Sequence, residues 1–265
     1  MDVLSKLLIK EIEMKKIKYG IIGTGVMGRE HIRNIELIEN AEVVALCDSH
    51  EPSINSSLEI INNNVQVFQN HLELINANIV DAYIIATPNF THIDILKDIV
   101  QTKAHLLVEK PLCTTIEDCI EFKKLANGYP GVIWTAMEYR YMPPVARLIE
   151  EIHNGSIGDL KMLSIREHRF PFLVKVNDWN RFSKNSGGTL VEKCCHFFDL
   201  MRLITQSEVL SVFASGAQNN NHLDESYDGK TPDIIDNAFV VLDFDNGVRG
   251  SLDLCMFAEN SKVQE

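Results

Sequence analysis

The sequence has neither a cysteine framework nor a long apolar run. Its six cysteines show no CxxC spacing, which argues against a zinc ribbon or a disulfide scaffold and is typical of a reduced, intracellular protein. No stretch approaches the roughly 20 apolar residues that span a bilayer. The first residues also lack the apolar core of a secretory signal and contain acids that a transit peptide avoids. We therefore expect a cytoplasmic protein without a membrane partner.

Basic residues are scarce as well, with 25 Lys and Arg against 37 Asp and Glu and a net charge of −12. Nucleic acids and anionic membranes attract basic patches, so neither is expected as a partner. Hydrophobic residues make up 45% of the 265 positions. That content is enough to bury a core in one large domain or two modest ones.

Both ends of the sequence carry an expectation. Met14 begins a run that would make a natural start, so residues 1–13 are either a short helical extension or a start-codon artefact. The segment after the last expected strand ends without a closing element. This abrupt end predicts that a C-terminal part is missing.

Short apolar strands alternate with helical patterns in residues 15–138. Such alternation predicts a parallel, doubly wound α/β sheet. The expected strands are Ile17–Ile22, Val43–Cys47, Val65–Phe68, Ala82–Ala86, Ala104–Val108 and Val132–Met137. The expected helices are Val26–Ile38, Ile93–Thr102 and Ile116–Ala126, the last with Thr115 as its N-cap.

The pattern changes in residues 139–265, which predict a second α+β domain with an open, largely antiparallel sheet and helices on one face. The sequence Asp245-Asn246-Gly247 is typical of a hairpin turn, and the polar segment Gln218–Asp233 predicts an exposed loop. The expected elements are helices at Val145–His153 and Leu190–Ile204, with strands at Leu160–His168, Val209–Gly216, Asn237–Phe244 and Val248–Phe257.

A GxGxxG motif joins the first expected strand to the first expected helix. Gly23 permits a tight turn, Gly25 lets a pyrophosphate approach the backbone, and Gly28 allows the helix to pack closely. The helix N-terminus offers free N–H groups to phosphates. The predicted phosphate-binding residues are Gly23, Thr24, Gly25, Val26, Met27 and Gly28.

Asp48 ends the second expected strand 20 residues after Gly28 (48 − 28 = 20). A carboxylate at this place accepts hydrogen bonds from the ribose hydroxyls and repels a 2′-phosphate. The position therefore favours NAD over NADP as the cofactor. The alternative reading is a glycine turn followed by a surface aspartate.

Two later strands end in polar residues, at the edge where open α/β sheets bind ligands. One runs into Thr87-Pro88-Asn89 and then His92, which either lines the cofactor or begins a helix. The other ends in Glu109-Lys110-Pro111. A charged pair at the end of an apolar strand faces either a cleft or solvent, and the strand alone does not decide which.

The segments GIIGTGVMG, ATPNFTH and VEKPL, together with Asp48, resemble the Gfo/Idh/MocA oxidoreductase family in order and spacing, from about residue 15 onward. The resemblance implies an N-terminal Rossmann domain and a C-terminal α/β domain whose open sheet often forms a homo-oligomer interface. It further implies that Thr87, Pro88, Asn89, His92 and Glu109 line the cofactor, that Lys110 contacts substrate and the nicotinamide ribose, and that Pro111 shapes the site.

Residues 187–199, which begin with two glycines, resemble a second signature of the family. On one continuous helix, Glu192, His196 and Asp199 would share a face. The resemblance implies that His196 is the general base and that Glu192 holds the substrate or orients the base. The family pattern has Asp at position 192 and a small residue at 194, so this chain departs from it at both. The alternative is a core histidine bonded to an acid.

The remaining candidates concern the substrate and a metal. The resemblance places Tyr139 and Arg140 in the cleft; Arg169 and Trp179 are further candidates for binding hydroxyls, unless they belong to an ordinary exposed sheet face. No metal is expected at Cys194-Cys195-His196, since adjacent helical residues point about 100° apart. The predicted substrate-binding residues are Lys110, Tyr139, Arg140, Arg169, Trp179 and Asp199.

The predicted function is hydride transfer between NAD and a hydroxyl-bearing carbon of a cyclic polyol or sugar, resembling inositol. Two alternatives stay open at this point. One is a non-catalytic or inactive, truncated NAD-binding protein. The other is an NAD-dependent glycoside hydrolase of the same family.

Overall fold

The computed structural model describes residues 16–259 and 263–264, and contacts divide the chain into two compact units. The first unit comprises the described residues through Thr87, with Asp98–Leu107 and Gly128–Trp134; the second comprises Pro88–Lys97, Val108–Asn127 and the described residues from Thr135 onward. Because the units interleave along the chain, a domain boundary after residue 138 stays a prediction. The expectation about residues 1–13 lies outside the described residues.

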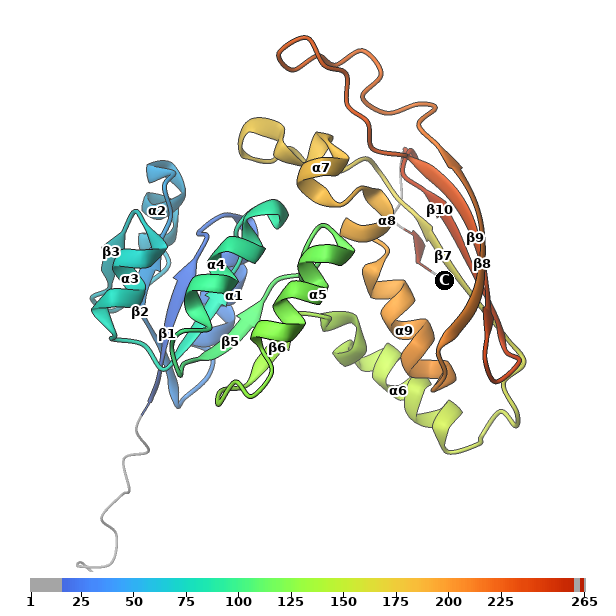
Figure 1. The fold of residues 1–265 in the computed structure, drawn as a ribbon, viewed down its shortest axis with the longest axis horizontal. Helices are drawn as coiled ribbons and strands as arrows, with labels where there is room; N and C mark the ends of the chain where they lie inside the picture. The colour runs from blue at the N-terminus through green and yellow to red at the C-terminus, as the bar shows by residue number, and fades with distance from the viewer. Residues whose placement is uncertain (1–15, 260–262, 265) are drawn as a thin grey trace, which may run out of the picture. The chain divides into compact units, whose positions relative to one another are not determined.

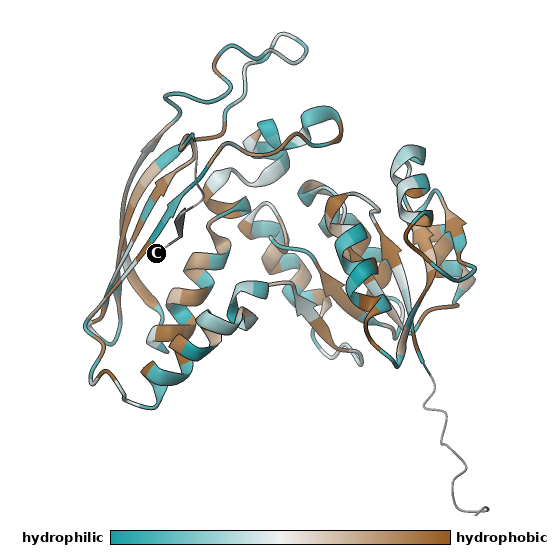
Figure 2. Cartoon of the chain, turned by 180° about the vertical axis from the view of Figure 1, so that it is seen from behind, coloured by the Kyte–Doolittle hydropathy of each residue, from teal (hydrophilic) through white to brown (hydrophobic). Residues whose placement is uncertain are grey.

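A six-stranded sheet with the order β3-β2-β1-β4-β5-β6 confirms the predicted doubly wound architecture (Figure 1). β1 pairs in parallel with β2 and β4, and β2 pairs in parallel with β3. Figure 2 shows these strands as largely hydrophobic, as expected when helices cover a parallel sheet. The strands are β1 (Ile17–Ile22), β2 (Ala41–Cys47), β3 (Gln66–Phe68), β4 (Ala82–Ile85), β5 (His105–Val108) and β6 (Ile133–Thr135).

The helices that connect these strands follow local signals to different degrees. α1 buries Gly28, Ile32 and Ile35, which repeat at helical spacing. The hydroxyl of Thr115 accepts a hydrogen bond from the Asp118 amide at 3.1 Å, which confirms the predicted N-cap. α2 and α3 were not predicted, because their short sequences carry little apolar periodicity. The helices are α1 (Val26–Glu36), α2 (Glu51–Leu58), α3 (His71–Ala77), α4 (His92–Ile99) and α5 (Ile116–Leu125).

The second unit contains a five-stranded sheet with the order β11-β7-β10-β9-β8. β9 and β10 form the predicted hairpin, with Gly247 at a φ of +83° in its turn. β7 and β10 pair in parallel, so the largely antiparallel sheet is mixed, which the strand pattern alone did not predict. The strands are β7 (Met162–His168), β8 (Val209–Ala217), β9 (Asn237–Phe244), β10 (Arg249–Cys255) and β11 (Val263–Gln264).

Helices cover one face of this sheet (Figure 1). From α9, Phe197 and Met201 pack against alternate residues of β9, including Val240 and Leu242. The period of two on the strand places these side chains on the same face. Among the described residues, no helix is long and apolar enough to cross a bilayer. The helices of this unit include α6 (Pro143–His153), α7 (Ser183–Ser186), α8 (Thr189–Glu192) and α9 (Cys195–Thr205).

The prediction of one continuous helix over Leu190–Ile204 is wrong. α8 ends at Glu192, two residues form a turn, and α9 begins at Cys195. The residue at the break, Lys193, is only 6% exposed and is paired with an acid on β7. Such a tertiary contact can override local helix propensity. Glu192 and His196 therefore lie on two consecutive helices and not on one continuous helix.

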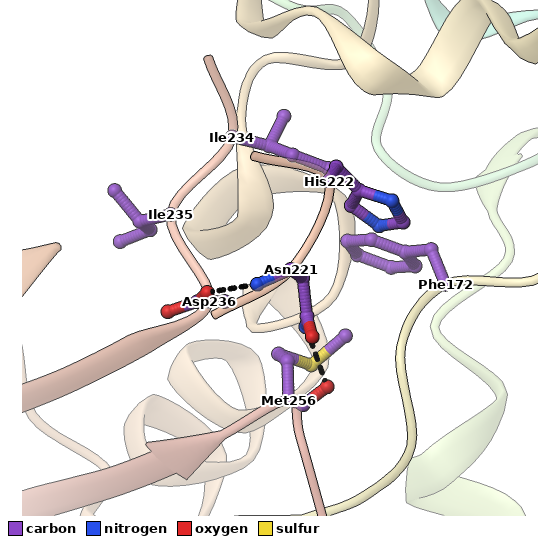
Figure 3. Close-up of a pocket in the computed structure, with 7 residues that line it drawn as sticks. All are labelled: Phe172, Asn221, His222, Ile234, Ile235, Asp236 and Met256. Carbon is purple, nitrogen blue, oxygen red and sulfur yellow. Dashed lines mark hydrogen bonds between the residues drawn. The ribbon is translucent and has the colours of Figure 1, made fainter. Parts of the chain in front are cut away.

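The segment Gln218–Asp233 is a loop as predicted, but it is not wholly exposed. The carboxylate of Asp236 accepts hydrogen bonds from the backbone amides of Asn219, Asn220 and Asn221, at 2.7–3.1 Å. The buried Asn221 side chain also donates to the carbonyl of Met256 at 2.7 Å (Figure 3). The many polar residues of this segment predicted that it is exposed. The sequence does not show that one buried carboxylate accepts hydrogen bonds from three of its backbone amides.

We expect Asp236→Asn to destabilise the second unit by about 1–3 kcal/mol at neutral pH, since it removes a charged acceptor of several amides. Burial raises the pKa of Asp236, but the amide hydrogen bonds outweigh it and lower the pKa below its ordinary value. The carboxylate therefore stabilises the fold above the unfolded pKa of about 4, and that contribution is lost as pH falls through the lower folded pKa. Urea unfolding should show a difference from wild type that shrinks in acid; a difference independent of pH would contradict this account.

Candidate active site

The glycine loop of the first unit has the form that a pyrophosphate needs. A Cβ on Gly23 would lie 2.5 Å from the backbone of Ala86, and one on Gly28 would lie 2.0 Å from the Gly23 carbonyl. Gly25 differs, because a Cβ there would meet nothing within 4 Å. Gly25 is also the N-cap of α1 without a side-chain cap, so no capping side chain binds the first amides of this helix. These residues fit a bound dinucleotide phosphate.

Asp48 follows β2 and is bonded to the glycine loop. Its Oδ2 accepts from the amide and hydroxyl of Thr24 at 2.7 and 3.0 Å, and its Oδ1 accepts from the amide of His50 at 2.8 Å. A carboxylate accepts about four hydrogen bonds, so these contacts leave capacity for a ribose hydroxyl. The predicted role of Asp48 therefore includes ordering the loop, a contact that spacing along the chain did not reveal.

The polar residues after β4 and β5 that belong to the second unit are held by buried hydrogen bonds. The side chain of Asn89 donates to the carbonyl of Ser186 at 3.0 Å. The Nδ1 of His92, at the start of α4, lies 3.0 Å from the carbonyl of Pro111. His92 is fully buried, and its contact holds the backbone next to Lys110. It thus supports the loop, while a direct contact of His92 with the cofactor stays a prediction.

Lys110 and the second glycine-led signature meet inside the second unit. The Nζ of Lys110 donates to the backbone carbonyl of Glu192 at 3.0 Å. Glu192 is the last residue of α8, where carbonyls have no partner within their own helix. The end of α8, just before the break, is therefore where the strand-end lysine contacts one of the predicted catalytic residues, Glu192.

The side chain of Glu192 lies in an unusual electrostatic position. It is 7% exposed, and its Oε2 has no hydrogen-bond partner among the residues that the structure describes. Burial raises the pKa of this carboxyl, and the charges of Lys110 and Lys175 offset part of the rise. Burial lowers the pKa of the Lys175 ammonium in turn. A buried acid oxygen of this kind fits a ligand that brings a hydroxyl donor.

His196 is positioned on α9 by stacking and by an acid. Its ring lies 4.2 Å from the ring of Tyr139, with an angle of 6° between the planes. Its Nε2 lies 3.5 Å from a carboxylate oxygen of Glu138, whereas the imidazole itself is 3% exposed. Desolvation raises the pKa of Glu138. The arrangement places a carboxyl group beside a buried imidazole.

The other predicted substrate-binding residues have partners within the second unit. Arg140 and Asp199 form a two-point ion pair, with one bond of 2.5 Å from Nε to Oδ2. The guanidinium of Arg169 lies 4.9 Å from the centre of the Phe170 ring. Trp179 is half-buried and lies edge-on to Phe90, with 6.4 Å between the ring centres. Because Arg140 and Asp199 bind each other, neither offers its full hydrogen-bonding capacity to a substrate.

Sequence reasoning missed four charged residues near this cluster, namely Glu138, Glu167, Lys175 and Lys193. The signal for one of them is visible in retrospect, because Lys193 interrupts an otherwise apolar helical pattern. The other three lie at the start of a 3-10 helix (Glu138), in β7 (Glu167) and in a loop (Lys175), where a single charge is not unusual. A separate small cavity lies beside the Gln218–Asp233 loop (Figure 3). The volume in which the centre of a water molecule fits there is about 10 Å³. It therefore holds about one water molecule and excludes a sugar.

Gly25→Ala should leave the unfolding temperature unchanged, since its Cβ points into open space. It should weaken NAD binding about tenfold or more, because that Cβ occupies the place of the pyrophosphate. Gly28→Ala places a Cβ 2.0 Å from the Gly23 carbonyl. This change should lower both the unfolding temperature and the affinity for NAD. Calorimetric titration with NAD and thermal unfolding of each variant separate these effects. Unchanged NAD affinity in Gly25→Ala would refute the assignment of this space to the phosphates.

Two family models cover most of the chain. The N-terminal "Oxidoreductase family, NAD-binding Rossmann fold" model matches residues 17–136, and the "Oxidoreductase family, C-terminal alpha/beta domain" model matches residues 149–265. Both describe the family named GFO_IDH_MocA. The matches confirm the family and the two-part fold that the motifs predicted.

Individual relatives agree with this assignment. The chain is 27% identical over 90% of its length to the uncharacterized oxidoreductase YrbE of Bacillus subtilis, and 29% identical over 89% to the myo-inositol 2-dehydrogenase of Thermotoga maritima. It spans 67% and 68% of their lengths. A crystal structure of a probable dehydrogenase from Thermotoga maritima matches 94% of the chain and 71% of its own, with 28% identity and a TM-score of 0.81. The chain therefore belongs to the Gfo/Idh/MocA family of oxidoreductases, whose N-terminal fold binds NAD.

Proposed function

We propose that this oxidoreductase oxidises a hydroxyl group of a cyclic polyol or sugar, with NAD as the hydride acceptor. The observation that supports this most directly is the 3.0 Å contact between Lys110 Nζ and the Glu192 carbonyl. It joins the strand-end lysine to the residues around His196 within one unit. The similarity to the Thermotoga maritima myo-inositol 2-dehydrogenase supports a cyclic polyol as the substrate class.

The proposed chemistry divides among three side chains. His196 takes the proton from the substrate hydroxyl, a task that suits a neutral imidazole, and Glu138 stabilises the imidazolium that forms. Lys110 places a positive charge where negative charge develops on the hydroxyl oxygen. Glu192 accepts a hydrogen bond from a second hydroxyl through its unpartnered Oε2. When bound, NAD supplies the acceptor for the hydride that leaves the carbon.

The negative charge of Asp48 supports NAD over NADP. It lies beside the glycine loop, bonded to Thr24, where a 2′-phosphate would be repelled. No arginine that could accept this phosphate directly follows Asp48. NADP is therefore the less favoured cofactor.

Lys110→Met and His196→Asn should each lower the rate of NADH formation about 100-fold or more, because each removes a group that acts on the reacting hydroxyl. Absorbance of NADH is measured with a panel of inositols and aldoses, and NAD affinity is measured in parallel. Affinity should stay within a few-fold of wild type for His196→Asn.

Three outcomes of that panel would count against the proposal. NAD binding with no turnover of any polyol or sugar favours a non-catalytic binding protein. Cleavage of a glycoside without net release of NADH favours a redox-assisted hydrolase. Equal rates in wild type and Lys110→Met would show that the lysine does not take part.

We also propose that the outer face of the second sheet forms a contact between copies of this chain. Phe213 of β8 pairs across the sheet with Val241 of β9, and Phe239 lies on the same face two residues before Val241. These side chains are 65%, 42% and 67% exposed. A cluster of exposed apolar side chains on a sheet face is typical of a protein interface.

Phe213→Lys and Phe239→Lys should shift the protein toward the monomer, because a buried unpaired lysine opposes association. Analytical ultracentrifugation across a dilution series measures the change. Leu37→Lys is the matched control, since Leu37 is 85% exposed at the end of α1 and lies outside this face. A wild-type protein that is already monomeric at high concentration would refute the contact.

A further inference from the structure

A buried ion pair lies next to the proposed catalytic histidine and has no role in the chemistry above. Glu167 of β7 is fully buried and Lys193, at the break between α8 and α9, is 6% exposed. The Nζ of Lys193 lies 3.2 Å from Oε1 of Glu167, and Arg169 approaches the same oxygen at 3.8 Å. Burying two charges is costly even when they pair, so the position calls for a reason beyond packing.

Lys193 also contacts the aromatic ring that lies against His196. Its Nζ donates to the hydroxyl of Tyr139 at 2.7 Å and lies 4.9 Å from the centre of that ring. The Tyr139 ring in turn stacks on the imidazole, 4.2 Å away and within 6° of parallel. A continuous series of contacts thus runs from the Glu167 carboxylate to the imidazole of His196.

We propose that Lys193, anchored by Glu167, is a positioning residue that holds the Tyr139 ring flat against His196. A histidine ring turns about two side-chain bonds, and the stacked tyrosine restricts the second of these rotations. The restricted imidazole keeps its Nε2 facing Glu138, 3.5 Å away. For its catalytic consequence this inference rests on the proposed function, because it assumes that His196 is the base.

The competing explanation is that the pair only attaches β7 to the helices. The two explanations differ in the variant that removes both charges, Glu167→Gln with Lys193→Met. Lys193→Met alone leaves Glu167 buried without its nearest cation and lowers the unfolding temperature. The double variant removes this penalty and should recover the unfolding temperature, yet it does not restore the hydrogen bond to Tyr139.

The kinetic test compares wild type, the double variant and Lys184→Met, a control at an exposed lysine of α7. In the double variant kcat should fall about tenfold to 100-fold with little change in NAD affinity, because a misplaced base slows the chemical step. Adding Tyr139→Phe to the double variant should lower kcat no further, since both changes break the same contact. Wild-type kcat in the stable double variant would overturn the proposal.

A second measurement needs no turnover and no cofactor. The ring current of Tyr139 should shift the NMR signal of the His196 Cε1 proton upfield in ring-labelled protein, and His196→Asn identifies this signal. In the double variant the signal should move downfield, whereas Lys184→Met should leave it unchanged. An unmoved signal overturns the positioning role. A moved signal in a protein that turns over no substrate would retain the positioning role and refute only the proposed function.

Discussion

The hydrogen bond from Lys110 Nζ to the carbonyl of Glu192 connects the two parts of the second unit that carry the proposed catalytic residues. The carbonyl is available because α8 stops at this residue. In an unbroken helix it would accept from the amide four residues later. The position of the lysine therefore depends on the break, and the break accompanies burial of Lys193. The burial of Lys193 at the break thus accompanies both the end of α8 and the position of the Lys110 ammonium.

Buried charge is the common property of the residues around this bond. Glu167, Glu192 and Lys193 each expose less than a tenth of their surface, and each would cost stability without a partner. Glu167 and Lys193 neutralise each other. Glu192 retains an oxygen without a partner in the described chain. The pair is thus matched in charge, although neither oxygen of Glu167 has a hydrogen-bond partner among the described residues. Under the proposed function, a substrate hydroxyl would bind the remaining oxygen of Glu192.

The glycines of the first unit also differ in whether contacts within the protein require them. Gly23 and Gly28 are required by close backbone contacts, so the fold would select them without any ligand. Gly25 has an ordinary φ of −65° and open space around it. No contact within the described protein therefore requires a glycine here, which fits the predicted approach of a pyrophosphate. Asp48 belongs to both groups, because its carboxylate orders Thr24 and retains capacity for a hydroxyl.

Much of the fold was predictable from sequence, because local periodicity reports burial directly. The strands of the parallel sheet, the Thr115 cap and the turn at Asp245-Asn246-Gly247 follow from patterns within about ten residues. The motifs likewise predicted the family, the cofactor and the residues Lys110 and His196 as candidates.

Only the tertiary structure decided which of these candidates meet. Glu192 and His196 lie on separate helices instead of one face, and Arg140 pairs with Asp199 across 59 residues of sequence. Likewise, the sequence shows Lys193 only as a charge within an apolar pattern. The structure adds its two partners, Glu167 and Tyr139. The physical reason is that periodicity records whether a side chain is buried, whereas the partner of a buried charge is set by packing between elements distant in the chain.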